Sequence, residues 1–153
     1  MAQTPLELLT FIAAPALITN ASAVLVLSTS NRFGRTVYRS RLLAGELAKA
    51  EAGSHDRMNL LEQHIIVRRR TRVLVRTLTS FYTAVGSFAF GTFSGLVGAA
   101  MEHFGLTAVA AALTALALAA VTVGTLAIAT GAVMLVAESR MALQGLAVED
   151  ERR

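Results

Sequence analysis

Three stretches of the chain are apolar over the length that a membrane crossing requires. They run over residues 6–30, 78–101 and 106–137 and contain a single charged residue, Glu7, near the start of the first stretch. Because a bilayer core of about 30 Å is crossed by about 20 residues of α-helix, the pattern predicts three transmembrane helices. The third stretch is longer than this, so we expect that helix to tilt or to project beyond the membrane.

The polar segment between the first two stretches has a helical pattern of its own. Residues 41–52 are rich in strong helix formers, and residues 59–76 contain neither glycine nor proline. Gly53–Asp56 lies between these two runs and is a turn signal. Ser54 or Asp56 is suited to cap the helix that follows the turn.

Together these elements predict an all-α integral membrane protein that forms a single membrane domain over residues 1–153. The first two of its three transmembrane helices are expected to extend into a helical hairpin over residues 31–76. Apolar residues along the first arm of this hairpin, such as Leu43, are expected to pack against Leu61, Ile65 and their neighbours on the second arm.

The composition agrees with a membrane protein and excludes several kinds of chemistry. Hydrophobic residues make up 54% of the chain and charged residues 16%, against about 25% charged in soluble domains. The absence of cysteine excludes disulfides, thiolate metal sites and a cysteine nucleophile. The chain also has no HExxH, no phosphate-binding GxxxxGKS/T loop and no pair of carboxylates inside a span. We therefore expect no enzyme activity, no catalytic residue, no metal site and no cofactor.

Basic residues are distributed very unevenly along the chain. Of the 14 lysines and arginines, 11 lie within residues 31–76, and the other three lie after residue 137. Short basic segments stay on the cytoplasmic side of a membrane. The pattern therefore predicts a protein of the cytoplasmic (inner) membrane with its N-terminus outside. Residues 31–76 and the C-terminal tail, 138–153, are expected in the cytoplasm.

Nine arginines lie near the predicted inner membrane surface. We call this set the arginine collar: Arg32, Arg35, Arg39, Arg41, Arg68, Arg69, Arg70, Arg72 and Arg76. The acids of the 31–76 segment lie toward its turn, away from the collar. Part of the collar is a topology signal at anionic headgroups, where each basic residue contributes about 1 kcal/mol. Arginine also binds phosphate bidentately, which favours anionic lipid or a protein partner as ligand. Nucleic acid is not expected, because the collar lies against the membrane and has few aromatic residues.

The second span carries a stripe of small residues along one face. At 100° per residue the stripe consists of Ser80, Ala84, Ser87, Gly91, Gly95, Gly98 and Glu102. Small residues let membrane helices approach closely, so we expect the central members of the stripe to form a packing surface, within one subunit or between subunits. Those central members are Ser87, Gly91, Gly95 and Gly98. Phe88, Phe90 and Phe93 are expected off this line, and a groove for ions that ends at Glu102 is the alternative.

A more polar stripe follows the first span. Its members share one half of the helix surface: Thr10, Leu17, Asn20, Val24, Ser28 and Asn31. An amide near mid-membrane needs a polar partner. Asn20 is therefore expected either to hydrogen-bond across a helix contact or to line a pore that forms when subunits assemble around this helix.

Two functions remain open on these grounds. The first is a small homo-oligomeric ion channel, in which the polar stripe lines the pore and Arg32 and Arg35 lie at its inner mouth. Three helices are too few to enclose a transport path in one subunit, so conduction would require an oligomer. The second is a non-conducting membrane scaffold, in which the arginine collar binds anionic lipid or a protein partner. The expected partners are thus membrane lipids, further copies of the chain and, for a channel, inorganic ions.

The run from Pro15 to Leu42, PALITNASAVLVLSTSNRFGRTVYRSRL, resembles a bacterial family of small membrane proteins, a domain of unknown function numbered 2721. The positions that carry the resemblance are Pro15, Ala16, Leu17, Asn31, Arg32, Arg35, Arg39 and Arg41. The cluster Arg68–Arg72 and the last two spans are similar as well, so the resemblance covers nearly the whole chain. It implies three spans and a cytoplasmic hairpin, and it implies no activity.

Overall fold

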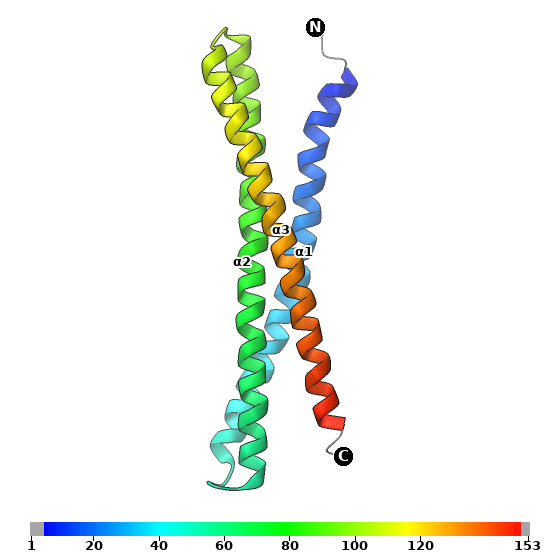
Figure 1. Ribbon diagram of the computed structural model, residues 1–153, viewed down its shortest axis with the longest axis vertical. Coiled ribbons are helices and arrows are strands. Elements are labelled where there is room, and N and C mark those ends of the chain that lie inside the picture. The colour runs from blue at the N-terminus through cyan, green and yellow to red at the C-terminus, as the bar shows by residue number, and fades with distance from the viewer. Residues whose placement is uncertain (1–4, 151–153) are drawn as a thin grey trace. The chain divides into compact units, whose positions relative to one another are not determined.

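The protein consists of three long α-helices, which confirms the all-α prediction. A computed structural model describes the backbone of residues 5–150 and the side chains of residues 17–142. The helices are α1 (Pro5–Lys49), α2 (His55–His103) and α3 (Thr107–Asp150), in that order along the chain (Figure 1). Each helix is far longer than the three turns that are usual in soluble domains.

Hydrogen bonds to the end of α1 and to the start of α2 stabilise the turn between these helices. Ser54 Oγ accepts a hydrogen bond from the backbone N–H of Arg57 at 3.2 Å, so Ser54, one of the two predicted candidates, is the N-cap of α2. The Arg57 guanidinium donates to the carbonyl oxygen of Ala50 at 3.1 Å, at the end of α1. Gly53 adopts a φ of 86°, a left-handed conformation that glycine reaches without strain.

The turn between α2 and α3 is a Schellman motif. The N–H of Leu106 donates to the carbonyl oxygen of Met101, and the N–H of Gly105 donates to that of Glu102, both at 3.0 Å. Gly105 has a φ of 78°. These bonds satisfy carbonyl groups that the end of a helix leaves without partners, and they reverse the chain into α3.

Two of the helices are long and apolar enough to cross a membrane, judged by length and composition. They are α2 and the Thr107–Ala142 part of α3. The predicted first span, residues 6–30, falls partly on residues 1–16, whose side chains lie outside the described part of the structure. It therefore stays a prediction.

The chain packs as two compact units, each of which takes in part of every helix. The first unit combines the chain up to Val26 with Ser80–Thr130. The second combines Leu27–Thr79 with the chain from Gly131 onward.

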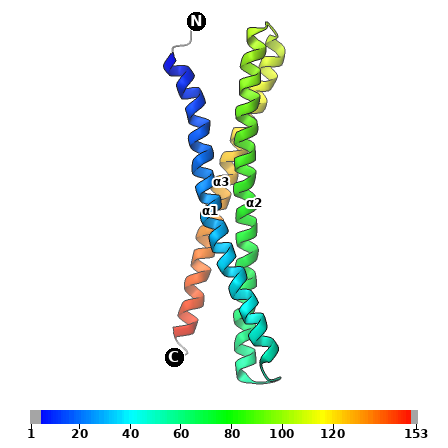
Figure 2. The same cartoon turned by 180° about the vertical axis from the view of Figure 1, so that it is seen from behind.

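Close packing of α2 against α3 forms the core of the first unit, and both views show these helices side by side (Figures 1 and 2). A Cβ atom added at Gly91 would lie 3.1 Å from the carbonyl oxygen of Ala117, and one added at Gly98 would lie 3.2 Å from Leu113 Cβ. Two members of the predicted stripe therefore lie at close contacts between α2 and α3 of the same chain. Small residues permit this approach because no side chain separates the backbones.

The buried line on α2 differs from the predicted stripe at Phe88. This side chain was expected off the line, but it is only 3% exposed. Among the predicted members Ser80, Ser87 and Gly95 are half-buried, whereas Glu102 is exposed. The buried positions on this part of α2 recur at steps of three or four residues: Phe81, Ala84, Phe88, Gly91, Ser94 and Gly98. Helices that stay in contact over several turns coil around each other, so their contacts recur every 3.5 residues rather than every 3.6.

The contact between Phe88 and Gly124 gives a test of this packing. A Cβ atom at Gly124 would lie 2.9 Å from Phe88 Cε1, too close to fit without movement of the ring. We expect Gly124→Ala to cost about 1–3 kcal/mol through overpacking, more than the helix propensity of alanine returns. Gly86→Ala is the matched control, because nothing lies within 4 Å of its added Cβ. Thermal unfolding in detergent should show a lower midpoint for Gly124→Ala and no loss for Gly86→Ala; equal midpoints would contradict this contact.

The second unit has a small core, with Leu43 and Leu74 fully buried. Leu61 and Ile65 were expected to face Leu43, but they are 48% and 59% exposed, so that expectation is wrong. The half-buried positions on this part of α2 are instead Asn59, Leu60, Gln63, His64, Ile66 and Val67. A one-residue change in helix phase turns a side chain by 100°, which moves Leu61 and Ile65 from the contact to the surface.

Candidate anion-binding site

All nine residues of the arginine collar lie in the second unit, four on α1 and five on α2. Eight of them are exposed, and Arg70 is half-buried. Among the described residues, six have no hydrogen-bond or ion-pair partner: Arg35, Arg41, Arg68, Arg69, Arg72 and Arg76. Arg39 donates to Gln63 Oε1 at 3.4 Å, a contact across the two helices with no charge on the acceptor. The collar therefore presents mostly uncompensated positive charge.

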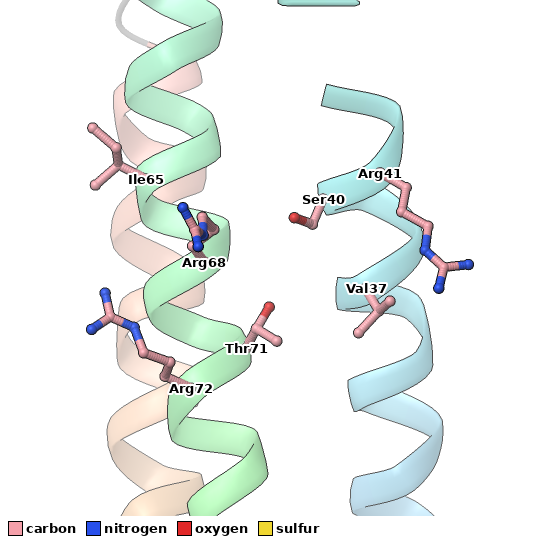
Figure 3. A pocket seen from close by; sticks show the side chains of 7 residues that line it. All are labelled: Val37, Ser40, Arg41, Ile65, Arg68, Thr71 and Arg72. Atoms are coloured by element: carbon pink, nitrogen blue, oxygen red, sulfur yellow. The ribbon is translucent and has the colours of Figure 1, made fainter. Parts of the chain in front are cut away.

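Three collar arginines line an open cleft between α1 and α2, which we call the first cleft (Figure 3). Its volume is about 630 Å³, and its lining consists of Val37, Ser40, Arg41, Ile65, Arg68, Thr71 and Arg72. Ser40 and Thr71 lie on the facing sides of the two helices, whereas Arg41 and Arg72 extend in opposite directions (Figure 3). No carboxylate belongs to this lining, so the first cleft offers hydroxyl groups and guanidinium groups to an anion.

A second cleft is bounded by all three helices. Its volume is about 690 Å³, and its lining consists of Ser28, Asn31, Arg32, Arg35, Thr36, Arg70, Glu138, Ser139 and Ala142. It differs from the first cleft in containing a carboxylate, which comes from α3. Two collar arginines of the second cleft are engaged by that group.

Glu138 is the most deeply buried charged group in the described part of the chain, with only 2% of its surface exposed. Its Oε1 accepts two hydrogen bonds from Arg70, at 3.0 Å from Nε and 2.6 Å from Nη2. Its Oε2 lies 3.5 Å from Arg32 Nη1, which also donates to Ser139 Oγ at 3.4 Å. A buried carboxylate is tolerated when it is paired and hydrogen-bonded in this way. The arrangement joins α2 to α3 through a charged contact.

The sequence pattern predicts Glu138 at the inner end of the third span, either paired or extended toward the membrane surface, but it does not identify a collar arginine as its partner. The structure brings Glu138 to Arg70 and Arg32 from a part of the chain 68 and 106 residues away. A signal for this pairing was present: Glu138 is the first charged residue after the uncharged run 106–137. A lone acid at the end of such a run, level with a group of arginines, is a candidate for a buried ion pair.

The polar stripe on the first helix lies on an open face of α1. Leu17 and Val24 are 68% and 61% exposed, and Asn20, Ser28 and Asn31 are also exposed. Ser28 and Asn31 additionally line the second cleft. Thr10, the first member of the stripe, lies outside the described residues.

Glu102 and His103, at the end of α2, line neither cleft. Both side chains are exposed, and the His103 ring contacts Phe104 edge to face at 5.9 Å between centroids. Within residues 17–142, no group of three histidine, aspartate or glutamate side chains is arranged to hold a metal ion.

The fold and the site define an all-α protein with two helices able to cross a membrane and an arginine-rich surface at one unit. The chain belongs to the family described as protein of unknown function (DUF2721), which it matches over residues 12–148. This match confirms the resemblance seen in the sequence and includes every residue of both clefts. No curated protein and no solved structure matches the chain.

Proposed function

We propose that the protein is an integral membrane protein that binds anionic lipid headgroups through its arginine collar. In this proposal three spans cross the inner membrane, the N-terminus lies outside, and residues 31–76 form a cytoplasmic hairpin with the collar at the headgroup level. The observation that carries the proposal is the set of six exposed collar arginines without a partner among the described residues.

The position of the collar supports this proposal. The predicted first span ends at residue 30 and the predicted second span begins at residue 78, so Arg32 and Arg76 fall within one turn of the membrane boundary. Guanidinium groups at that level meet lipid phosphates, which they bind with two parallel hydrogen bonds. An arginine that is already paired with a carboxylate gains less from a lipid phosphate, and within residues 17–142 only Arg70 and Arg32 are paired in this way.

Replacement of Arg68, Arg69 and Arg72 by glutamine tests the proposal. These side chains are exposed and have no partner among the described residues, so the fold should not depend on them. At about 1 kcal/mol for each basic residue near an anionic surface, the triple variant should retain phosphatidylglycerol about 100-fold more weakly. Native mass spectrometry of the protein released from mixed nanodiscs measures this retention.

Two control variants separate the effects of charge and of position. The triple arginine-to-lysine variant keeps the charge but loses the bidentate geometry, so we expect an intermediate loss. Lys49→Gln removes a charge close to the turn, far from the predicted membrane boundary, and should leave retention unchanged. Retention by the triple glutamine variant equal to that of the unchanged protein at physiological salt would refute lipid binding by the collar.

A homo-oligomeric ion channel is the second candidate, and the open polar face of α1 favours it. Asn20 is exposed, and it has no hydrogen-bond partner among the described residues. In a membrane this amide would face lipid unless another subunit or water covered it, which favours assembly around this face. The pore would then be lined by the polar stripe, with Arg32 and Arg35 at its inner mouth.

Substitution within the stripe tests the channel. Val24→Trp should narrow such a pore and reduce ion flux into liposomes by about tenfold or more, and Asn20→Leu should reduce it by removing a ring of polar groups. Val133→Trp on α3, at a side chain 70% exposed, adds the same bulk outside the proposed pore and should leave flux unchanged. No flux from the unchanged protein, or flux indifferent to Val24→Trp, would rule out this pore.

A further inference from the structure

The second cleft holds more positive than negative charge, and the excess is localised. Arg32, Arg35 and Arg70 face a single carboxylate, Glu138. Arg70 donates two short hydrogen bonds to Glu138 Oε1, whereas Arg32 Nη1 lies 3.5 Å from Glu138 Oε2. Arg70 is therefore largely compensated, and Arg32 is compensated only weakly.

Four polar residues of the second cleft share one face of α1. Ser28, Asn31, Arg32 and Arg35 are spaced at i, i+3, i+4 and i+7, which places their side chains in one row. The Arg32 side chain is 50% exposed, and Arg35 is exposed with no partner among the described residues. One rigid helix thus presents to a ligand the Arg35 guanidinium, an amide, a hydroxyl and the Arg32 guanidinium, which has only long contacts to Glu138 and Ser139.

We propose that the second cleft is a binding site for one phosphate group, held by Arg32 and Arg35 and oriented by Asn31. In this proposal Glu138 is the internal counter-anion: it holds Arg70 in place and limits the affinity for the external anion. The phosphate could come from a lipid headgroup, and for that source the inference rests on the proposed lipid function. Inorganic phosphate is the other source with the same chemistry.

The guanidinium groups of the second cleft suit a phosphate ligand. Phosphate offers several acceptor oxygens to paired guanidinium groups, and such charge-assisted bonds are about twice as strong as neutral ones. Glu138 opposes the ligand because like charges in one cleft repel and because it occupies donors that the phosphate would use. Removal of its charge with retention of its shape should therefore strengthen binding.

Three variants test the site by the same retention measurement in nanodiscs that contain phosphatidylcholine with or without phosphatidylglycerol. Arg35→Gln should weaken phosphatidylglycerol retention about tenfold, and Arg32→Gln/Arg35→Gln should weaken it further, since each substitution removes charge-assisted hydrogen bonds to the phosphate. Glu138→Gln, which leaves an amide oxygen to accept from Arg70, should strengthen retention severalfold. Calorimetric titration of inorganic phosphate into protein in phosphatidylcholine nanodiscs identifies the second source.

The outcomes separate this site from the wider lipid function. If the Arg68, Arg69 and Arg72 variant loses retention but Arg32→Gln/Arg35→Gln does not, the collar function stands and the site is refuted. If phosphatidylglycerol is not retained but inorganic phosphate binds in an Arg35-dependent way, the site stands and the lipid function is refuted. Weaker retention by Glu138→Gln at an unchanged unfolding midpoint would refute its role as counter-anion. Arg35→Gln keeps the test decisive if Glu138→Gln does not fold, because Arg35 has no partner among the described residues.

Discussion

Glu138→Ala is expected to lower the free energy of unfolding by about 3–5 kcal/mol, the cost of removing one partner of a buried ion pair. Glu138 is only 2% exposed, and its Oε1 accepts both bonds from Arg70. Truncation leaves the Arg70 guanidinium, 29% exposed, without its counter-charge and leaves a cavity beside it. Arg32 suffers less, because its half-exposed side chain can be hydrated.

Unfolding by denaturant in detergent measures this loss. Arg140→Ala is a nearby control at an exposed side chain on the same helix, and it should change stability by less than about 0.5 kcal/mol. The double variant Glu138→Ala/Arg70→Met removes both charges and should recover much of the loss, since an apolar pair can replace a buried ion pair at little cost. A loss below about 1 kcal/mol for Glu138→Ala would contradict the buried pair.

Leu43→Ala is expected to cost about 2–5 kcal/mol, the range for a fully buried leucine that leaves a cavity. Leu43 has no exposed surface, whereas Leu42, its neighbour on α1, is 42% exposed. The two substitutions remove the same atoms from consecutive positions of one helix. Leu42→Ala should therefore cost less than about 1 kcal/mol, because that site leaves no enclosed cavity.

This pair of variants also tests which face of α1 is buried in the second unit. The unfolding free energies of Leu42→Ala and Leu43→Ala are compared in the same detergent. A difference of about 2 kcal/mol or more is expected from the packing of the second unit. Equal losses would show that the α1 face that carries Leu43 is not buried.

The local features of this chain could be predicted from its sequence because they depend on neighbouring residues. Apolar runs without proline after residue 15 predict long helices. The turn at Gly53 and the cap at Ser54 follow from the backbone freedom of glycine and from a hydroxyl beside the first free N–H groups of a helix. Each of these preferences acts over a few residues and needs no information about the rest of the chain.

Features that depend on the exact phase of two packed helices were predicted less well. The small-residue stripe located Gly91 and Gly98 in the α2–α3 contact, but it left out Phe88, which the contact buries. Leu61 and Ile65 were expected in the core of the second unit and are exposed. The sequence pattern gives the period of a helix, whereas the contact line depends on how the partner helix coils around it.

The sequence by itself determined the helices, the turn at Gly53 and the concentration of nine arginines on α1 and α2. Only the tertiary structure decided which of these arginines are compensated. Glu138 lies 68 residues from Arg70 and 106 residues from Arg32, and no local preference links them. Their contact exists because helix packing carries a carboxylate out of water, where it must find a cation. Within residues 17–142, packing brings no second carboxylate to the remaining exposed arginines.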